Sequence, residues 1–162
     1  MSPKASPERD EIASIQHWSV YGQKGEPSAR RIEPEEWEVK SFKRPASTKW
    51  KGSVPADQVL QLLNGFCPTV MEEKWFVYSD GPDAAGNAAI HMHRSWCGEK
   101  MVELRIKVPL EDGELANADA RIKEIVWESD PTRWRWASEE FAKATAIEVC
   151  DWVMDVKLGI SK

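Results

Sequence analysis

The sequence predicts an α+β protein: one antiparallel meander sheet of about four to five strands, packed against a long C-terminal helix and a shorter helix in the first half of the chain. Two observations carry this prediction. Four strand-like segments follow one another, at Lys74–Asp80, Ala89–Trp96, Met101–Leu110 and Arg121–Ser129. The turns between them are shorter than the dozen or more residues of a parallel crossover, and apolar residues repeat at helical spacing only before and after these segments.

Length and composition fit a single domain. The chain has 162 residues, of which 41% are hydrophobic and 30% charged, enough to bury one core. Residues 1–14 are polar and contain two prolines, so we expect a flexible N-terminal tail there. Residues 15–162 are expected to form one globular α+β domain.

Charge and cysteine content narrow the possible partners. The net charge is −5 and the Lys and Arg residues are scattered, which argues against nucleic acid as a partner. No apolar stretch approaches the about 18 residues that span a membrane, and the N-terminus lacks an apolar signal core, so we expect a cytoplasmic protein. The three cysteines are far apart and predict free thiols. Because His91, His93 and Cys97 lack a fourth partner, we expect neither a structural zinc nor any other cofactor.

The first half of the chain predicts one strand and one helix. "EWEVKSF", residues 36–42, alternates in character and predicts a half-exposed strand, which "KRPASTKWKG" then interrupts. The helix is expected to start near Ser53, a capping residue, with Pro55 in its first turn. Asn64 and Gly65 supply a stop signal at its end.

The second half contains the clearest patterns. "KWFVYSD" is aromatic and β-branched, as strands often are. In "MVELRIKVPL" every second residue is apolar, the period of a strand with one buried face: Val102, Leu104, Ile106 and Val108. "EDGELANAD" reads as a loop before the last strand. The long helix is expected to open at Ser138, with acidic residues in its first turn, and to end at Gly159.

The stretch "AAIHMHRSWCGEK", residues 88–100, gathers the most reactive side chains. On a strand, Ile90 and Met92 face the core, and Arg94 and Trp96 continue that side toward the turn. The side chains that face the other way are His91, His93 and Ser95.

Three interpretations of this stretch stay open. His93 and Ser95 could be a catalytic base and nucleophile, but same-face neighbours on a strand are about 7 Å apart and no G-x-S-x-G motif is present. Arg94, Ser95, a histidine and the Gly98 backbone could instead bind an anion, with Trp96 as a stacking surface. Alternatively, the histidines are structural and Arg94 stacks on a tryptophan.

The segment Glu72–Ile106 also resembles a little-characterised bacterial domain with a K-W-F-I-Y … F-H-R-S-W-T-G pattern. The matching residues are Lys74, Trp75, Phe76, His93, Arg94, Ser95, Trp96 and Gly98. Cys97 stands where that domain has Thr, and Met92 where it has an aromatic residue. The resemblance implies a common fold and a shared turn, and a context of ADP-ribose or NAD metabolism.

A second cluster, "DPTRWRWAS", alternates arginines with tryptophans just before the long helix. Arg133 and Trp134 are its candidate ligand contacts, because guanidinium groups stack on indoles. Trp and Arg also dominate the energetic centres of protein interfaces. Alternatively, the cluster closes one end of the sheet against the helix.

These observations lead to two hypotheses on function. The first is a ligand-binding or accessory domain for an anionic small molecule, nucleotide- or ADP-ribose-like, held by His93, Arg94, Ser95, Trp96, Gly98, Arg133 and Trp134. The alternative is a non-enzymatic protein–protein interaction module, regulatory or immunity-type, that uses surface tryptophans. An enzyme ranks third, with no catalytic residue assigned, and the sequence does not determine the oligomeric state.

Overall fold

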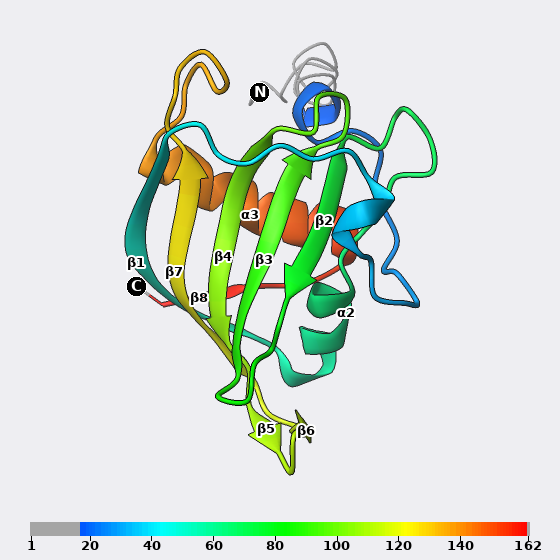
Figure 1. The fold of residues 1–162 in the computed structure, drawn as a ribbon, viewed down its shortest axis with the longest axis vertical. Helices are drawn as coiled ribbons and strands as arrows, with labels where there is room; N and C mark the ends of the chain where they lie inside the picture. Colours follow the sequence, from blue (N-terminus) through cyan, green and yellow to red (C-terminus); the bar gives the residue numbers. More distant parts are fainter. Residues whose placement is uncertain (1–16, 162) are drawn as a thin grey trace, which may run out of the picture.

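A computed structural model of the chain describes residues 17–161 (Figure 1); the expected tail, residues 1–14, lies outside them. Six strands form the main sheet: β1 (Pro45–Val54), β2 (Trp75–Asp80), β3 (Asn87–Arg94), β4 (Lys100–Lys107), β7 (Ala120–Glu128) and β8 (Gly159–Ile160). A small hairpin pairs β5 (Leu110–Glu111) with β6 (Glu114–Leu115). The helices are α2 (Val59–Asn64) and α3 (Glu139–Met154), with 3₁₀ turns at Pro34–Glu36 and Ala56–Gln58.

The α+β class is confirmed. The sheet order is β2-β3-β4-β7-β1-β8, and all neighbours are antiparallel. The four predicted strands are consecutive neighbours in that order, as expected for an antiparallel meander. β1 and the two-residue β8 extend the sheet to six strands. No helix among the described residues is long and apolar enough to cross a membrane.

Several predicted boundaries are wrong. Residues 36–42 form no strand; after a 3₁₀ turn that ends at Glu36 they cross the sheet, with a single bridge from Lys40 to Glu99. The strand forms instead at Pro45–Val54, in the segment expected to interrupt. Ser53 therefore belongs to a strand, and the helical turns begin only at Ala56. The expected loop at 111–119 contains most of the β5–β6 hairpin.

The main core lies between the sheet and α3, which crosses behind the strands in Figure 1. Ser138 caps α3 as expected, since its Oγ accepts a hydrogen bond from the Phe141 amide at 3.1 Å. The helix ends at Met154 rather than at Gly159, because Asp155 takes a left-handed conformation at φ 55°. We call the sheet face toward α3 the inner face and the opposite one the outer face.

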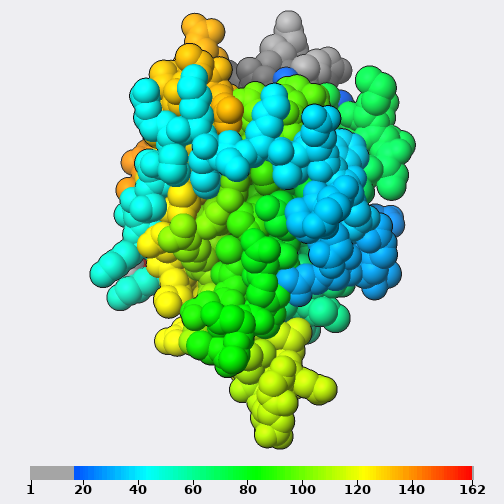
Figure 2. Space-filling view, viewed as in Figure 1, coloured from blue at the N-terminus to red at the C-terminus, as the bar shows by residue number. Residues whose placement is uncertain are grey.

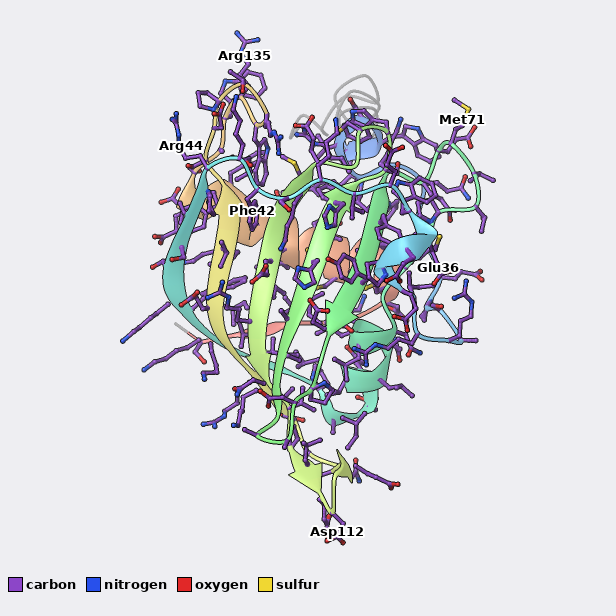
Figure 3. All side chains as sticks on the ribbon, viewed as in Figure 1. Glu36, Phe42, Arg44, Met71, Asp112 and Arg135 are labelled. Atoms are coloured by element: carbon purple, nitrogen blue, oxygen red, sulfur yellow. The ribbon has the colours of Figure 1, made fainter. Side chains whose placement is uncertain are left out.

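A segment without strand structure, residues 32–44, crosses the outer face; it contains the Pro34–Glu36 turn, and we call it the strap. Trp37 stacks on Phe76 with ring centroids 5.7 Å apart. The buried Glu128 carboxylate accepts hydrogen bonds from the amides of Lys43 and Arg44 at 2.7 and 2.8 Å. Figure 2 shows the strap covering the upper part and one side of this face, and Figure 3 places Phe42 over the strands. The lower part of the outer face stays open.

Candidate binding pocket

A pocket of about 760 Å³ lies where β3 ends, beside the loop at residues 130–137. Four of the seven predicted site residues line it: Arg94, Trp96, Arg133 and Trp134. Two segments more than thirty-five residues apart in sequence therefore meet at one site. Ser19 and Val20, from the segment before the sheet, also line it, as do Phe141 and Thr145 of α3.

Arg94 is the central charged group of this pocket. Its Nη1 donates a hydrogen bond to the Arg133 carbonyl at 2.9 Å, and its guanidinium lies 5.3 Å from the Trp96 ring centroid. Burial lowers the pKa of Arg94 from its ordinary value, and the nearby negative groups offset only part of that cost. Within residues 17–161 it forms no ion pair, and Glu99, an acid close enough to affect its pKa, is paired with Arg133. Arg94 is therefore a partly buried cation without a carboxylate partner in the described part of the chain.

Two tryptophans form an exposed rim. Trp96 is 58% exposed and Trp136 is 71% exposed. Lys74 Nζ lies 5.7 Å from the Trp96 ring centroid, and the Arg135 guanidinium lies 5.1 Å from that of Trp136. Figure 3 shows Arg135 at the outer tip of its loop, pointing away from the sheet. The rim thus combines flat aromatic surfaces with positive charge.

Arg133 and Trp134 shape the pocket more than they offer free groups to it. Arg133 Nη1 donates to the Ser41 carbonyl at 2.7 Å, and its Nε lies 3.2 Å from a Glu99 carboxylate oxygen. Its charge is already compensated. Trp134 is buried in the core and meets Phe141 edge-on at 5.5 Å. Trp134 thus packs against α3, as the structural alternative in the sequence analysis expects, while Arg133 links its loop to the strap.

The structure places the other three predicted residues outside this pocket. Ser95 Oγ donates to the Glu73 carbonyl at 3.0 Å, which occupies its hydroxyl. His93 lies on the outer face and donates from Nδ1 to the Gly98 carbonyl at 2.9 Å, so it forms no hydrogen bond with Ser95. Gly98 has a φ of 72°, and a Cβ there would lie 2.2 Å from the Glu38 carbonyl oxygen. The Gly98 backbone is thus packed closely against the strap, which accounts for a glycine at this position.

The outer face contains a separate polar network under and beside the strap. His91 Nε2 lies 2.7 Å from Asp80, its Nδ1 lies 3.3 Å from Glu103, and its ring stacks on Tyr78 with centroids 4.5 Å apart. Burial alone would raise the pKa of Glu103, but His91, Lys100 and Arg105 hold it well below its ordinary value. Each carboxylate of this network thus lies beside a basic group, while His91 Nδ1 has no hydrogen-bond partner among the described residues. Among residues 17–161 no cluster of three or more His, Cys, Asp or Glu side chains is arranged to hold a metal ion.

Some pocket residues were not assigned from the sequence. Trp136 belongs to the recognised "RWRW" cluster, but alternation alone does not say which tryptophan is buried. Phe141 was missed although a signal existed: it is a large apolar residue on the exposed side of an amphipathic helix. Val20 carries no such signal, because its place in the pocket depends on long-range packing.

Similarity to known proteins adds nothing to this geometry. The chain matches no protein-family model, and neither the curated proteins nor the solved structures include a significant match to it.

Proposed function

We propose that the protein is a binding domain for an anionic small molecule with a flat aromatic group, of the nucleotide or ADP-ribose type, and that the ligand occupies the Arg94–Trp96 pocket. One observation carries the proposal. Arg94 is a partly buried guanidinium with no carboxylate partner among the described residues. Burying an uncompensated charge is costly, and a bound anion would offset that cost.

The surroundings of Arg94 support this ligand class. A guanidinium presents a planar fork of donors that matches phosphate or carboxylate oxygens. Trp96 and Trp136 offer exposed indole faces on which an aromatic ring can stack. The volume of about 760 Å³ falls in the range of small-molecule sites. The resemblance to a domain from ADP-ribose and NAD contexts points to the same chemistry.

Binding measurements on two pocket variants test the proposal. We expect ADP-ribose and AMP to raise the melting temperature, because a ligand that binds only the folded state stabilises it. Arg94→Lys keeps a cation but loses the fork, so we expect affinity to fall about tenfold. Trp96→Ala removes an exposed ring and should weaken AMP more than ribose 5-phosphate, which has no base.

Trp18→Ala is the matched control, since Trp18 is exposed but does not line the pocket. It should bind as the unchanged protein does. The proposal is wrong if neither ADP-ribose nor AMP shifts the melting temperature, or if Arg94→Lys and Trp96→Ala both keep full affinity.

A second candidate is the protein-interaction module. The observation that favours it is the group of exposed apolar side chains that line the pocket: Val20, Trp96, Trp136 and Phe141. Contiguous exposed apolar surface of this kind marks interaction sites. A protein partner would be released by Trp136→Ala but would stay bound when AMP is added. Bound ADP-ribose, in contrast, would be displaced by added AMP.

A further inference from the structure

A second hollow, of about 1110 Å³, lies at the opposite end of β3 from the Arg94 pocket. It spans β1, β7, β4 and the turn between β2 and β3. Asn87, the first residue of β3, lines it, whereas Arg94, the last residue, lines the pocket. Seven residue steps along a strand separate the two by roughly 24 Å. The strap leaves this part of the outer face uncovered (Figure 2).

Five basic side chains line the hollow in a chain whose net charge is −5. They are Lys49, Lys51, Arg105, Arg121 and Lys123. Arg105 is neutralised by Glu103 at 2.9 Å and Glu124 at 2.8 Å. The other four form no ion pair with any residue in the described part of the chain.

The acidic side chains of the hollow are already engaged. Asp80 lies 2.7 Å from His91, and Glu124 is held by Arg105. Asp83 accepts hydrogen bonds from the amides of Ala85 and Asn87, both at 2.9 Å. The carboxylates are thus occupied at short range, while four cations are not.

The strand register brings these cations close together. Lys49 pairs with Glu124 and Gly52 with Ile122, so the shift in register leaves Lys51 beside Lys123. Neighbouring strands are about 4.8 Å apart and same-face residues about 7 Å apart, distances at which like charges repel. Lysines often protect exposed sheet edges from aggregation. That role does not explain Arg121 and Lys123, because β7 lies inside the sheet between β4 and β1.

From this arrangement we infer a second ligand site: the hollow binds a small molecule that carries two or three linked phosphate groups, held by Lys49, Lys51, Arg121 and Lys123. Linked phosphates supply several negative charges within the span of these four side chains. The lining contains no aromatic residue, so a base would find no stacking surface. Recognition therefore rests on the phosphates, whether free or part of a nucleotide. This site is independent of the proposed function of the Arg94 pocket.

Calorimetric titration with tripolyphosphate and with ATP at low ionic strength tests the inference. At the hollow both should bind with similar affinity, and added salt should weaken both. The double variant Lys49→Gln/Lys123→Gln should weaken both about tenfold or more, since it removes two charged contacts. Lys24→Gln/Lys40→Gln changes the net charge equally outside the hollow and should weaken them by about twofold or less.

Four results would overturn the inference. One is absence of tripolyphosphate binding at low salt; a second is equal weakening in both double variants. A third is loss of tripolyphosphate binding in Arg94→Gln but not in Lys49→Gln/Lys123→Gln, which places the anion in the pocket and supports the proposed function instead. The fourth is binding of a single-stranded oligonucleotide through the hollow while tripolyphosphate does not bind.

Discussion

His93 is a buried neutral histidine on the outer face, and its burial there opposes protonation of its ring. It is 2% exposed, its Nδ1 donates to the Gly98 carbonyl, and its Nε2 has no partner among the described atoms. Tyr78 stacks on its ring with centroids 5.7 Å apart. Burial lowers the pKa of His93 from 6.5 to about 4, although the hydrogen bond to Gly98 opposes that shift.

The stability of the protein should therefore fall as the pH falls from 6.5 toward 4. In this window the unfolded chain binds a proton at His93 that the folded chain does not, so protons favour unfolding. Between pH 7 and pH 5 this histidine should cost about 2 kcal/mol of unfolding free energy. Over the same interval the unfolding free energy of His93→Phe should fall by about 2 kcal/mol less than that of the unchanged protein. Urea unfolding at both pH values measures this difference.

Phenylalanine is a suitable replacement at this position. The Gly98 carbonyl still accepts the Lys40 amide at 2.8 Å, and the ring joins Phe76 and Tyr78. All other titrating groups are shared by the two chains, so their effects cancel. Equal losses in both proteins would show that His93 titrates in the folded state as it does in the unfolded chain.

At the scale of single elements, α3 depends on the cap that the sequence predicts. Ser138→Ala removes the acceptor of the Phe141 amide, which leaves that group without a partner in the first turn. We expect the unfolding free energy to drop by about 1 kcal/mol. Ser47→Ala provides the comparison: Ser47 is exposed on β1 and forms no side-chain hydrogen bond within the described residues. It should change stability by less than about 0.5 kcal/mol, and an equal effect of the two substitutions would contradict the capping role.

Alternation patterns explain why some elements could be predicted from the sequence and others could not. An alternating pattern reports that one side of an extended chain is buried, and in β4 that side belongs to a sheet strand. Residues of the strap also alternate between more and less buried, because the strap lies flat on the outer face. It takes almost no part in strand pairing. β1 was missed because its start contains Pro45 and its outward residues are lysines, both typical of a loop.

In the candidate site, too, local patterns predicted some features, while others depend on long-range packing. The strand register of β3 correctly separated Arg94 from His93, because alternation along a strand is a local property. That Arg133 and Trp134 would meet Arg94 was beyond local patterns, since it depends on how the loop after β7 folds over the strand end. The role of Gly98 was also misplaced: only the tertiary structure shows the strap passing over it.

At the scale of the whole molecule, the sheet is covered differently on its two faces. α3 buries the inner face, and the strap covers the upper outer face, on which Phe76 and Val126 are buried outside the main core cluster. The Arg94 pocket opens at one end of this assembly, and its rim presents the exposed rings of Trp96 and Trp136. Stability and ligand binding should therefore depend on different tryptophans.

Two substitutions of the same kind test this separation. Trp37→Ala removes the stack on Phe76 and the hydrogen bond from Nε1 to the Ser95 carbonyl at 3.0 Å. It should lower the unfolding free energy by about 3 kcal/mol, at the low end for tryptophan truncation because the side chain is half-buried. Trp136→Ala removes a ring that is 71% exposed and should change stability by less than about 0.5 kcal/mol.

The affinity for ADP-ribose should follow the opposite order. Trp136→Ala should weaken it about tenfold by removing a stacking surface, whereas Trp37→Ala should leave it unchanged at a temperature where that variant is folded. Urea unfolding and calorimetric titration of both variants measure the two quantities. If Trp37→Ala lost the ligand while Trp136→Ala kept it, binding would belong to the outer face under the strap, and the pocket assignment would be wrong.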